Sequence, residues 1–140
     1  MHMVLATKAA DDQPWVAGAA AEFARKTGAT VAVVSVDEVE LERLVPAPRS
    51  IYLEQAAAAA AAAAEQLTAA GVTATQTVLS GRALDRILEY AEREKADVIV
   101  VGASDRSPVA ERLLGSVPLA LIERSSRPIL VIPHPGHRAP

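Results

Sequence analysis

The sequence has 140 residues, of which 51% are hydrophobic, so it can form one domain with a core of ordinary size but has no room for a second. Its formal net charge is −3 and only 3% of its residues are aromatic, so neither a basic groove nor stacking platforms for nucleic acid are evident. The absence of cysteine excludes disulfides, thiol catalysis and thiolate metal sites. We therefore expect one domain spanning residues 1–140, with no nucleic-acid partner.

We expect neither a membrane partner nor secretion. No apolar run approaches the roughly 18 residues of a membrane span, and the alanine stretch at 56–64 is short and weakly apolar. The first residues, Met-His-Met-Val-Leu, lack a basic region followed by an apolar stretch and a cleavage site. These features predict a cytoplasmic protein.

Short β-branched runs alternate with longer helical patterns along the chain, which is typical of a parallel sheet flanked by helices. We predict an α/β fold with five strands and four helices. The strands are expected at residues 3–7, 30–36, 74–79, 98–101 and 129–132. The helices are expected at about 14–27 and 49–70, in a segment opened by Ser80-Gly81, and from residue 117 onward.

The first helix is expected to begin near Pro14, with Asp11 or Asp12 as its N-cap, and to end at Gly28. Its core-facing side is predicted from residues at helical spacing, namely Val16, Ala20, Phe23 and Thr27. Residues 37–48 are charged and contain two prolines near their end, so we expect a loop there.

The second helix contains nine consecutive alanines, the only low-complexity stretch in the sequence. Alanine has the best helix propensity and allows close packing on a sheet, so we interpret this stretch as a structural helix rather than a dedicated partner surface. Leu53 and Leu67 are expected to share its buried face, and Gly71 to end it. In the third helix the buried face is predicted from Leu84, Ile87, Leu88 and Ala91.

Two glycine positions bracket the loop between the last two strands. Gly102 stands where a strand stops, and Gly115-Ser116 precedes a new helix, which suits backbone that approaches an anion closely. The Ser116 hydroxyl and the amides of the following turn would form a phosphate cradle. The alternatives are a glycine that only permits a turn and a capping serine that holds no ligand.

This spacing resembles the universal stress protein family, whose nucleotide-binding members carry glycine, two residues, glycine, nine residues, and then glycine followed by Ser or Thr. Gly102, Gly115 and Ser116 fit the pattern, whereas Asp105 stands at the second glycine. The resemblance extends over nearly the whole chain, including the LLGSV segment and the entry to the last strand through Arg127-Pro128. It implies a doubly wound sheet in the order 3-2-1-4-5, with a ligand crevice at the carboxyl ends of strands one and four.

The resemblance also implies a site for ATP or AMP, with Mg²⁺, formed by Thr7, Lys8, Val36, Val101, Gly102, Asp105, Gly115, Ser116 and Val117. Nucleotide-binding relatives usually place an aspartate just after the first strand, where this chain has Lys8. A carboxylate at Asp105 would repel a phosphate about 4 Å away by about 4 kcal/mol, unless a bridging cation or the loop arginines offset it. We hypothesise that Lys8 and Asp105 pair across the crevice and close part of the pocket.

We therefore expect a regulatory or binding module of the stress response rather than a catalyst. A slow ATPase is the enzymatic alternative, and a site retuned for AMP or cyclic AMP, with Lys8 supplying positive charge, is another. The resemblance implies a homodimer through the edge strand 129–132. Residues 134–140, which include His134 and His137, are expected to form a flexible tail without a metal.

Overall fold

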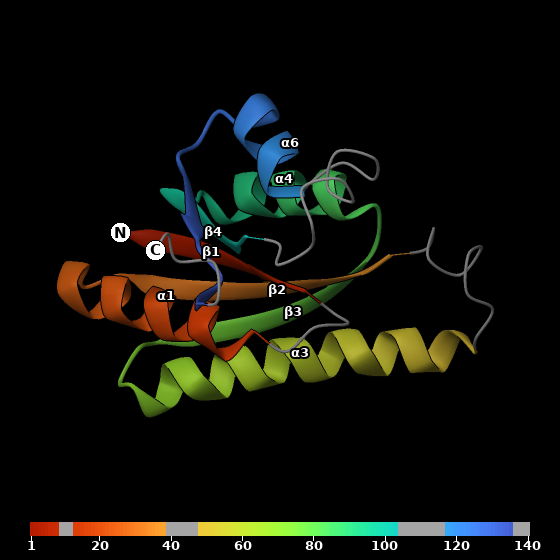
Figure 1. The fold of residues 1–140 in the computed structure, drawn as a ribbon, viewed down its shortest axis with the longest axis horizontal. Coiled ribbons are helices and arrows are strands. Elements are labelled where there is room, and N and C mark those ends of the chain that lie inside the picture. Colours follow the sequence, from red (N-terminus) through yellow and green to blue (C-terminus); the bar gives the residue numbers. More distant parts are fainter. Residues whose placement is uncertain (9–12, 39–47, 104–116, 136–140) are drawn as a thin grey trace.

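The computed structural model describes residues 1–8, 13–38, 48–103 and 117–135 (Figure 1). These ranges contain five strands and four helices, the numbers that the sequence predicts. In chain order the elements are β1 (His2–Thr7), α1 (Pro14–Thr27), β2 (Thr30–Glu38), α3 (Arg49–Ala69), β3 (Ala74–Gly81), α4 (Ala83–Glu94), β4 (Val98–Gly102), α6 (Val117–Arg124) and β5 (Ile129–Ile132).

The five strands form one parallel sheet in the order β3-β2-β1-β4-β5, as predicted. Helices α1 and α3 cover one face of the sheet, and α4 and α6 cover the other (Figure 1). The winding therefore reverses between β1 and β4. In an open α/β sheet this reversal leaves a crevice at the carboxyl ends of the two strands, where ligands bind.

Two hydrophobic clusters, one on each face of the sheet, form the core. Met3 and Leu5 of β1 pack on the α1/α3 face, whereas Val4 and Ala6 pack on the α4/α6 face. All four side chains are buried, because helices cover both faces of a parallel sheet. This arrangement accounts for the unbroken apolar runs in the sequence.

The alanine-rich helix α3 packs closely on β2 and β3, as the structural interpretation of its sequence predicts. Its buried residues are Ala56, Ala60, Ala63, Ala64 and Leu67. The prediction is wrong for Leu53, which is 39% exposed, since the first turns of α3 extend beyond the end of the sheet (Figure 1). None of the helices in the described ranges has the length and hydropathy needed to cross a bilayer.

Helix α1 begins at Pro14 and ends at Gly28, whose left-handed φ of 70° fits the predicted glycine cap. Gln13 occupies the N-cap position that the sequence assigned to Asp11 or Asp12, and those two residues lie outside the described part of the chain. The buried stripe comprises Val16, Ala17, Ala20, Ala21 and Ala24. Phe23 is 47% exposed and Thr27 is exposed, so both were wrongly assigned to the core; the stripe is centred nearer Ala17, which leaves Phe23 at its edge.

Strands β2 and β3 each extend two residues further than their sequences predict. Asp37 pairs with Ser80 and Glu38 with Gly81, so both residues belong to β2 and not to the loop that the sequence predicts from residue 37. Asp37 is only 1% exposed, and the Ser80 hydroxyl donates a hydrogen bond to its Oδ2 at 3.2 Å. Ser80-Gly81 therefore ends β3 instead of opening a helix, and α4 starts at Ala83.

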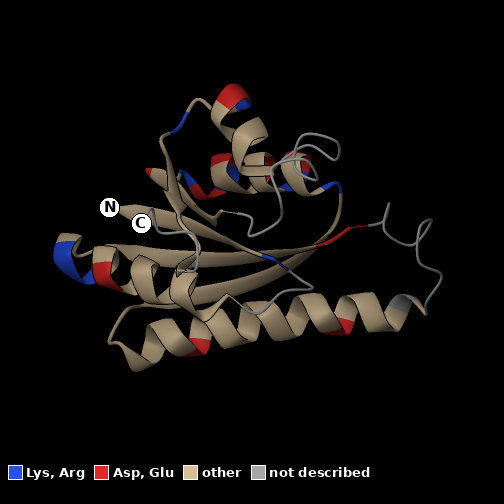
Figure 2. Cartoon of the chain, viewed as in Figure 1, with Lys and Arg blue, Asp and Glu red and all other residues tan. Residues whose placement is uncertain are grey.

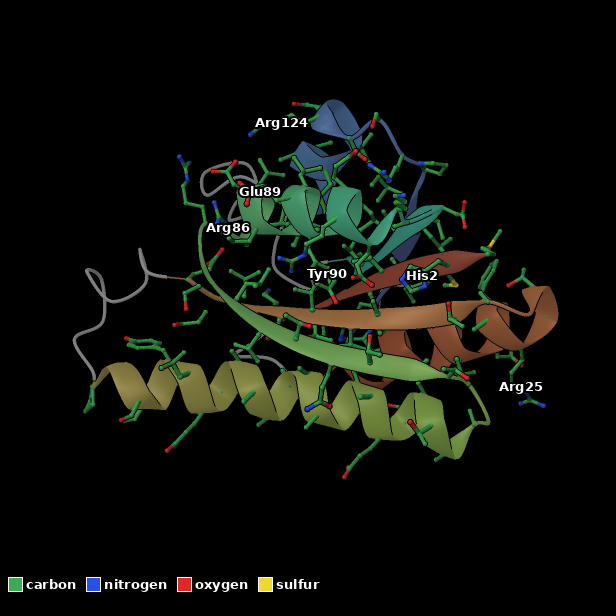
Figure 3. The ribbon with its side chains drawn as sticks, turned by 180° about the vertical axis from the view of Figure 1, so that it is seen from behind. His2, Arg25, Arg86, Glu89, Tyr90 and Arg124 are labelled. Atoms are coloured by element: carbon green, nitrogen blue, oxygen red, sulfur yellow. The ribbon has the colours of Figure 1, made fainter. Side chains whose placement is uncertain are left out.

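Helix α4 buries one apolar face, as its helical spacing predicts. Ile87, Tyr90 and Ala91 are buried, while Leu84 and Leu88 are partly buried against the same cluster. The Tyr90 hydroxyl donates a hydrogen bond to Thr77 Oγ1 at 3.3 Å, which anchors the helix to β3. The charged residues lie on the outer side, where Arg86 pairs with Glu89 at 2.9 Å (Figure 3).

A candidate ligand pocket between helices α1 and α3

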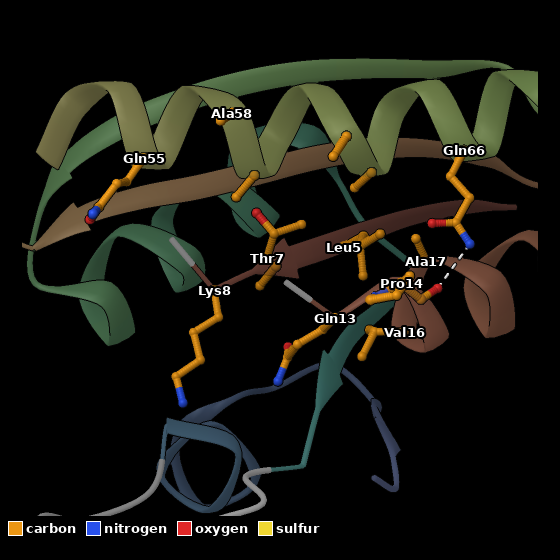
Figure 4. Close-up of a pocket in the computed structure, with 14 residues that line it drawn as sticks. Leu5, Thr7, Lys8, Gln13, Pro14, Val16, Ala17, Gln55, Ala58 and Gln66 are labelled. Atoms are coloured by element: carbon orange, nitrogen blue, oxygen red, sulfur yellow. Dashed lines mark hydrogen bonds between the residues drawn. The ribbon is translucent and has the colours of Figure 1, made fainter. Parts of the chain in front are cut away.

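A cavity of about 350 Å³ opens at the carboxyl end of β1, between the start of α1 and residues 55–66 of α3 (Figure 4). Its volume lies in the range of small-molecule sites. The lining residues are Leu5, Ala6, Thr7, Lys8, Gln13, Pro14, Val16, Ala17, Gln55, Ala58, Ala59, Ala62, Ala63 and Gln66. The pocket thus lies at the carboxyl end of β1, one of the two strands that flank the reversal of winding, and on the α1/α3 side of the sheet.

The pocket is present because the residues that face it from α3 are small. Its α3 wall consists of four alanines with a glutamine at each end, at positions 55, 58, 59, 62, 63 and 66. This spacing of three and four residues forms one stripe of a helix, and alanine methyls leave space between α3 and α1. Larger aliphatic side chains at the same positions would fill it.

The pocket combines apolar walls with a few polar groups. Gln66 Nε2 donates a hydrogen bond to the Pro14 carbonyl at 2.8 Å and ties α3 to the first turn of α1 (Figure 4). Thr7 Oγ1 donates a hydrogen bond to the Val34 carbonyl at 3.3 Å, so the lone pairs of the hydroxyl can still accept one. Gln13 and Gln55 add two more amides. Such a lining suits a ligand with a flat apolar body and donor and acceptor groups at its edge.

Lys8 is the charged member of the described lining. Because side chains alternate along a strand, Thr7 shares the α1/α3 face with Leu5, and Lys8 turns to the other side. Figure 4 shows the Thr7 side chain directed toward α3 and the Lys8 side chain directed away from it. Lys8 thus borders the pocket with its side chain directed away from the alanine wall. Figure 2 shows that α3 itself is largely uncharged, with Glu54 and Glu65 as its acidic residues.

Two predicted site residues, Val36 and Val101, belong to the opposite face of the sheet. Their side chains are buried in the α4/α6 cluster and do not line the pocket. The backbone of Val36, unlike its side chain, lies next to the crevice. The pairing of β1 with β2 stops at Thr7 and Ser35, whereas β2 continues beside β3 to Glu38. The edge of β2 beyond Ser35 therefore borders the crevice, and Val36 can contribute to a site through its backbone.

The structure adds a third reason for a glycine at position 102, besides the turn and the anion contact that the sequence suggests. A Cβ built at this position would lie 2.7 Å from Val16 Cγ2 and 2.9 Å from Gln13 Oε1, which is closer than side chains pack. The start of α1 therefore rests directly on the backbone at the end of β4. Close packing accounts for the residue without a ligand, and the phosphate-facing role stays a prediction.

The remaining predicted site residues are placed only in part. Val117 is the first residue of α6 and is partly buried against the α4/α6 cluster. Asp105, Gly115 and Ser116 lie outside the described residues, so the pairing of Lys8 with Asp105 stays a hypothesis. His134, assigned to the flexible tail, packs edge-on against Trp15 with ring centroids 4.7 Å apart. The described residues contain no cluster of three or more His, Asp or Glu that could hold a metal ion.

Comparison with known proteins decides the family. The family model named Universal stress protein family matches residues 1–133. The chain belongs to the universal stress protein family. This confirms the resemblance drawn from Gly102, Gly115 and Ser116, and the sheet order that it implied.

Two universal stress proteins of Methanocaldococcus jannaschii illustrate the similarity in sequence. MJ0531 is 37% identical over 65 residues, or 46% of this chain, and MJ0577 is 29% identical over 98 residues, or 70% of it. The matched segments span 38% and 57% of these relatives' own lengths. Among solved structures, a universal stress protein in complex with cAMP superposes with a TM-score of 0.73 at 26% identity, covering 94% of this chain and 95% of that one.

Proposed function

We propose that this universal stress protein is a regulatory module that binds an adenine nucleotide, with the nucleoside in the α1/α3 pocket and the phosphate near Lys8. The observation that carries the proposal is the cavity itself, an alanine-walled space of about 350 Å³ at the carboxyl end of β1, with Lys8 as the charged residue of its described lining. The similar structure in complex with cAMP supports the choice of ligand class.

The chemistry of the lining fits a purine nucleoside. A purine ring is flat and apolar on its faces, so it can lie against the methyl groups of Ala58, Ala59 and Ala62. Its edge carries both donors and acceptors, which glutamine amides complement in a bidentate way. The backbone edge of β2 beyond Ser35 offers further hydrogen-bonding groups beside the same crevice.

A monophosphate fits this site better than a triphosphate with Mg²⁺. Lys8 supplies one positive charge, which suits a phosphate monoester or a cyclic diester. Magnesium is usually bound through carboxylates together with substrate phosphates, and the described lining consists of neutral residues and Lys8. We therefore expect binding of AMP or cyclic AMP without turnover. A slow ATPase would instead release phosphate from Mg²⁺-ATP.

Calorimetric titration of AMP, cyclic AMP and ATP, with and without Mg²⁺, tests the proposal. The variant Ala59→Leu fills the pocket and should weaken AMP binding by about tenfold or more, equivalent to about 1.4 kcal/mol. Ala61→Leu is the matched control, because Ala61 is also partly exposed on α3 but does not line the pocket. Equal AMP affinities in the two variants would mean that the ligand binds elsewhere. If the parent protein binds none of the three nucleotides, the proposal of nucleotide binding is refuted. Phosphate release from ATP would favour the ATPase.

We also propose that two copies pair through β5. This strand lies at the edge of the sheet, and Ile129, Leu130 and Val131 are only partly buried. The neighbouring helix α6 adds Leu119 and Ile122, which are 57% and 55% exposed. An exposed apolar edge strand favours pairing with a second strand, and a two-fold axis satisfies both copies at once. Sedimentation at micromolar concentration should show a dimer, and a monomer would contradict the pairing.

A further inference from the structure

We propose that Gln13 determines how long a ligand the pocket accepts, because its side chain lies between the pocket and the end of β4. The inference rests on the proposed nucleotide binding and concerns the same site. It makes Gln13 a selectivity residue that favours a nucleoside or a monophosphate over an extended phosphate chain.

The position of Gln13 follows from the way α1 begins. Gln13 is the N-cap residue, with φ of −126° and ψ of 64°, but its side chain makes no capping hydrogen bond to the first turn. It extends over β4 instead, where its Oε1 would be 2.9 Å from a Cβ at Gly102. In Figure 4 its side chain points away from α3, in the same general direction as that of Lys8.

Gln13 therefore belongs to two surfaces at once. It lines the pocket, and it covers the backbone of Gly102 at the end of β4. Val16 fills the adjoining space, since its Cγ2 would lie 2.7 Å from the same Cβ. A ligand in the pocket that extends toward the end of β4 must displace the Gln13 amide, whereas a compact ligand near Lys8 need not.

The other glutamines of the pocket cannot act in this way. Gln66 is held by its hydrogen bond to the Pro14 carbonyl at 2.8 Å, and Gln55 lies at the far end of the alanine stripe on α3. The atoms nearest to the Cβ position at Gly102 belong to Val16 and Gln13 and not to these two glutamines. Gln66 thus provides a matched control, with the same side chain in the same pocket.

The test compares the affinities of adenosine, AMP and ATP for the full chain and three variants by calorimetry. Gln13→Ala should raise the ratio of ATP to AMP affinity by about tenfold, the low end of the effect of one extra or missing group in a pocket. Gln66→Ala should change both affinities by the same factor and leave the ratio as it is. Gln13→Glu keeps the length of the side chain and adds a negative charge, so it should lower the ratio.

The outcomes separate the two proposals. If AMP binds and the ATP to AMP ratio is the same in Gln13→Ala as in the parent, the role of Gln13 is refuted while nucleotide binding stands. A shift of the ratio in Gln66→Ala as large as that in Gln13→Ala would also refute it. If neither the parent nor Gln13→Ala binds any of the three ligands, nucleotide binding fails and the inference fails with it.

Discussion

Replacing Gly102 by alanine tests the packing that positions the site. The new Cβ would lie 2.7 Å from Val16 Cγ2 and 2.9 Å from Gln13 Oε1, so one of these neighbours, or the backbone, has to move. Overpacking of this kind costs about 1 to 3 kcal/mol. For a chain of this length, each kcal/mol lowers Tm by about 3 °C, so we expect Gly102→Ala to lose about 3 to 9 °C.

Gly18 provides the matched control within α1. A Cβ there would lie 3.4 Å from Gln66 Nε2, an ordinary contact, and the residue is in a helix interior where alanine is favoured. Gly18→Ala should therefore stabilise the protein by about 0.5 to 1 kcal/mol. Both variants can be measured by urea unfolding with linear extrapolation, followed by circular dichroism and by the fluorescence of Trp15, the single tryptophan.

A double-mutant cycle identifies the cause of the loss. Val16→Ala removes the methyl group that is nearest to the new Cβ, so the pair Gly102→Ala and Val16→Ala should cost less than the sum of the two single variants. We expect the difference to be about 1 kcal/mol. Strict additivity, or a Gly102→Ala variant as stable as the parent, would refute the close packing of α1 on β4.

Two further predictions concern charged residues. Arg127 Nε donates a hydrogen bond to the Ala96 carbonyl at 2.7 Å, so Arg127→Ala should destabilise the fold by about 1 to 2 kcal/mol in urea unfolding. Arg124 is exposed and forms an ion pair with Asp85 at 3.6 Å, so Arg124→Ala should lower the free energy of unfolding by at most about 0.5 kcal/mol. Equal losses of stability in Arg127→Ala and Arg124→Ala would contradict this ranking. The double variant Lys8→Asp with Asp105→Gly should bind ATP more tightly than the parent in calorimetry; unchanged affinity would contradict the hypothesis that these residues close the pocket.

The fold could be predicted from the sequence because its signals are local. Unbroken β-branched runs such as Val98–Val101 occur where helices cover both faces of a strand, and Gly28 ends α1 as a glycine cap should. The ends of β2 and β3 were missed because Asp37 and Ser80 are polar residues that favour a loop in isolation. Asp37 is buried and Ser80 is exposed, and the two residues are held in the sheet by the pairing of β2 with β3 and by their hydrogen bond of 3.2 Å, which no local pattern shows.

The site was predicted less completely than the fold. The family resemblance predicted a site at the carboxyl ends of the strands. It did not show that the Lys8 side chain turns away from the face that Thr7 lines, although the two-residue period of a strand implies this. The pocket was missed because it depends on small residues. The stripe from Gln55 to Gln66 was present in the sequence as a helical pattern, but its alanines were interpreted only as packing residues.

A crystal structure of the protein with AMP would test the central proposal most directly. We expect the adenine ring against the alanine stripe of α3 that includes Ala58, Ala59 and Ala62, and the phosphate on the side of Lys8. Nucleotide bound on the α4/α6 face beside Val36 and Val101, with the α1/α3 pocket empty, would contradict the account.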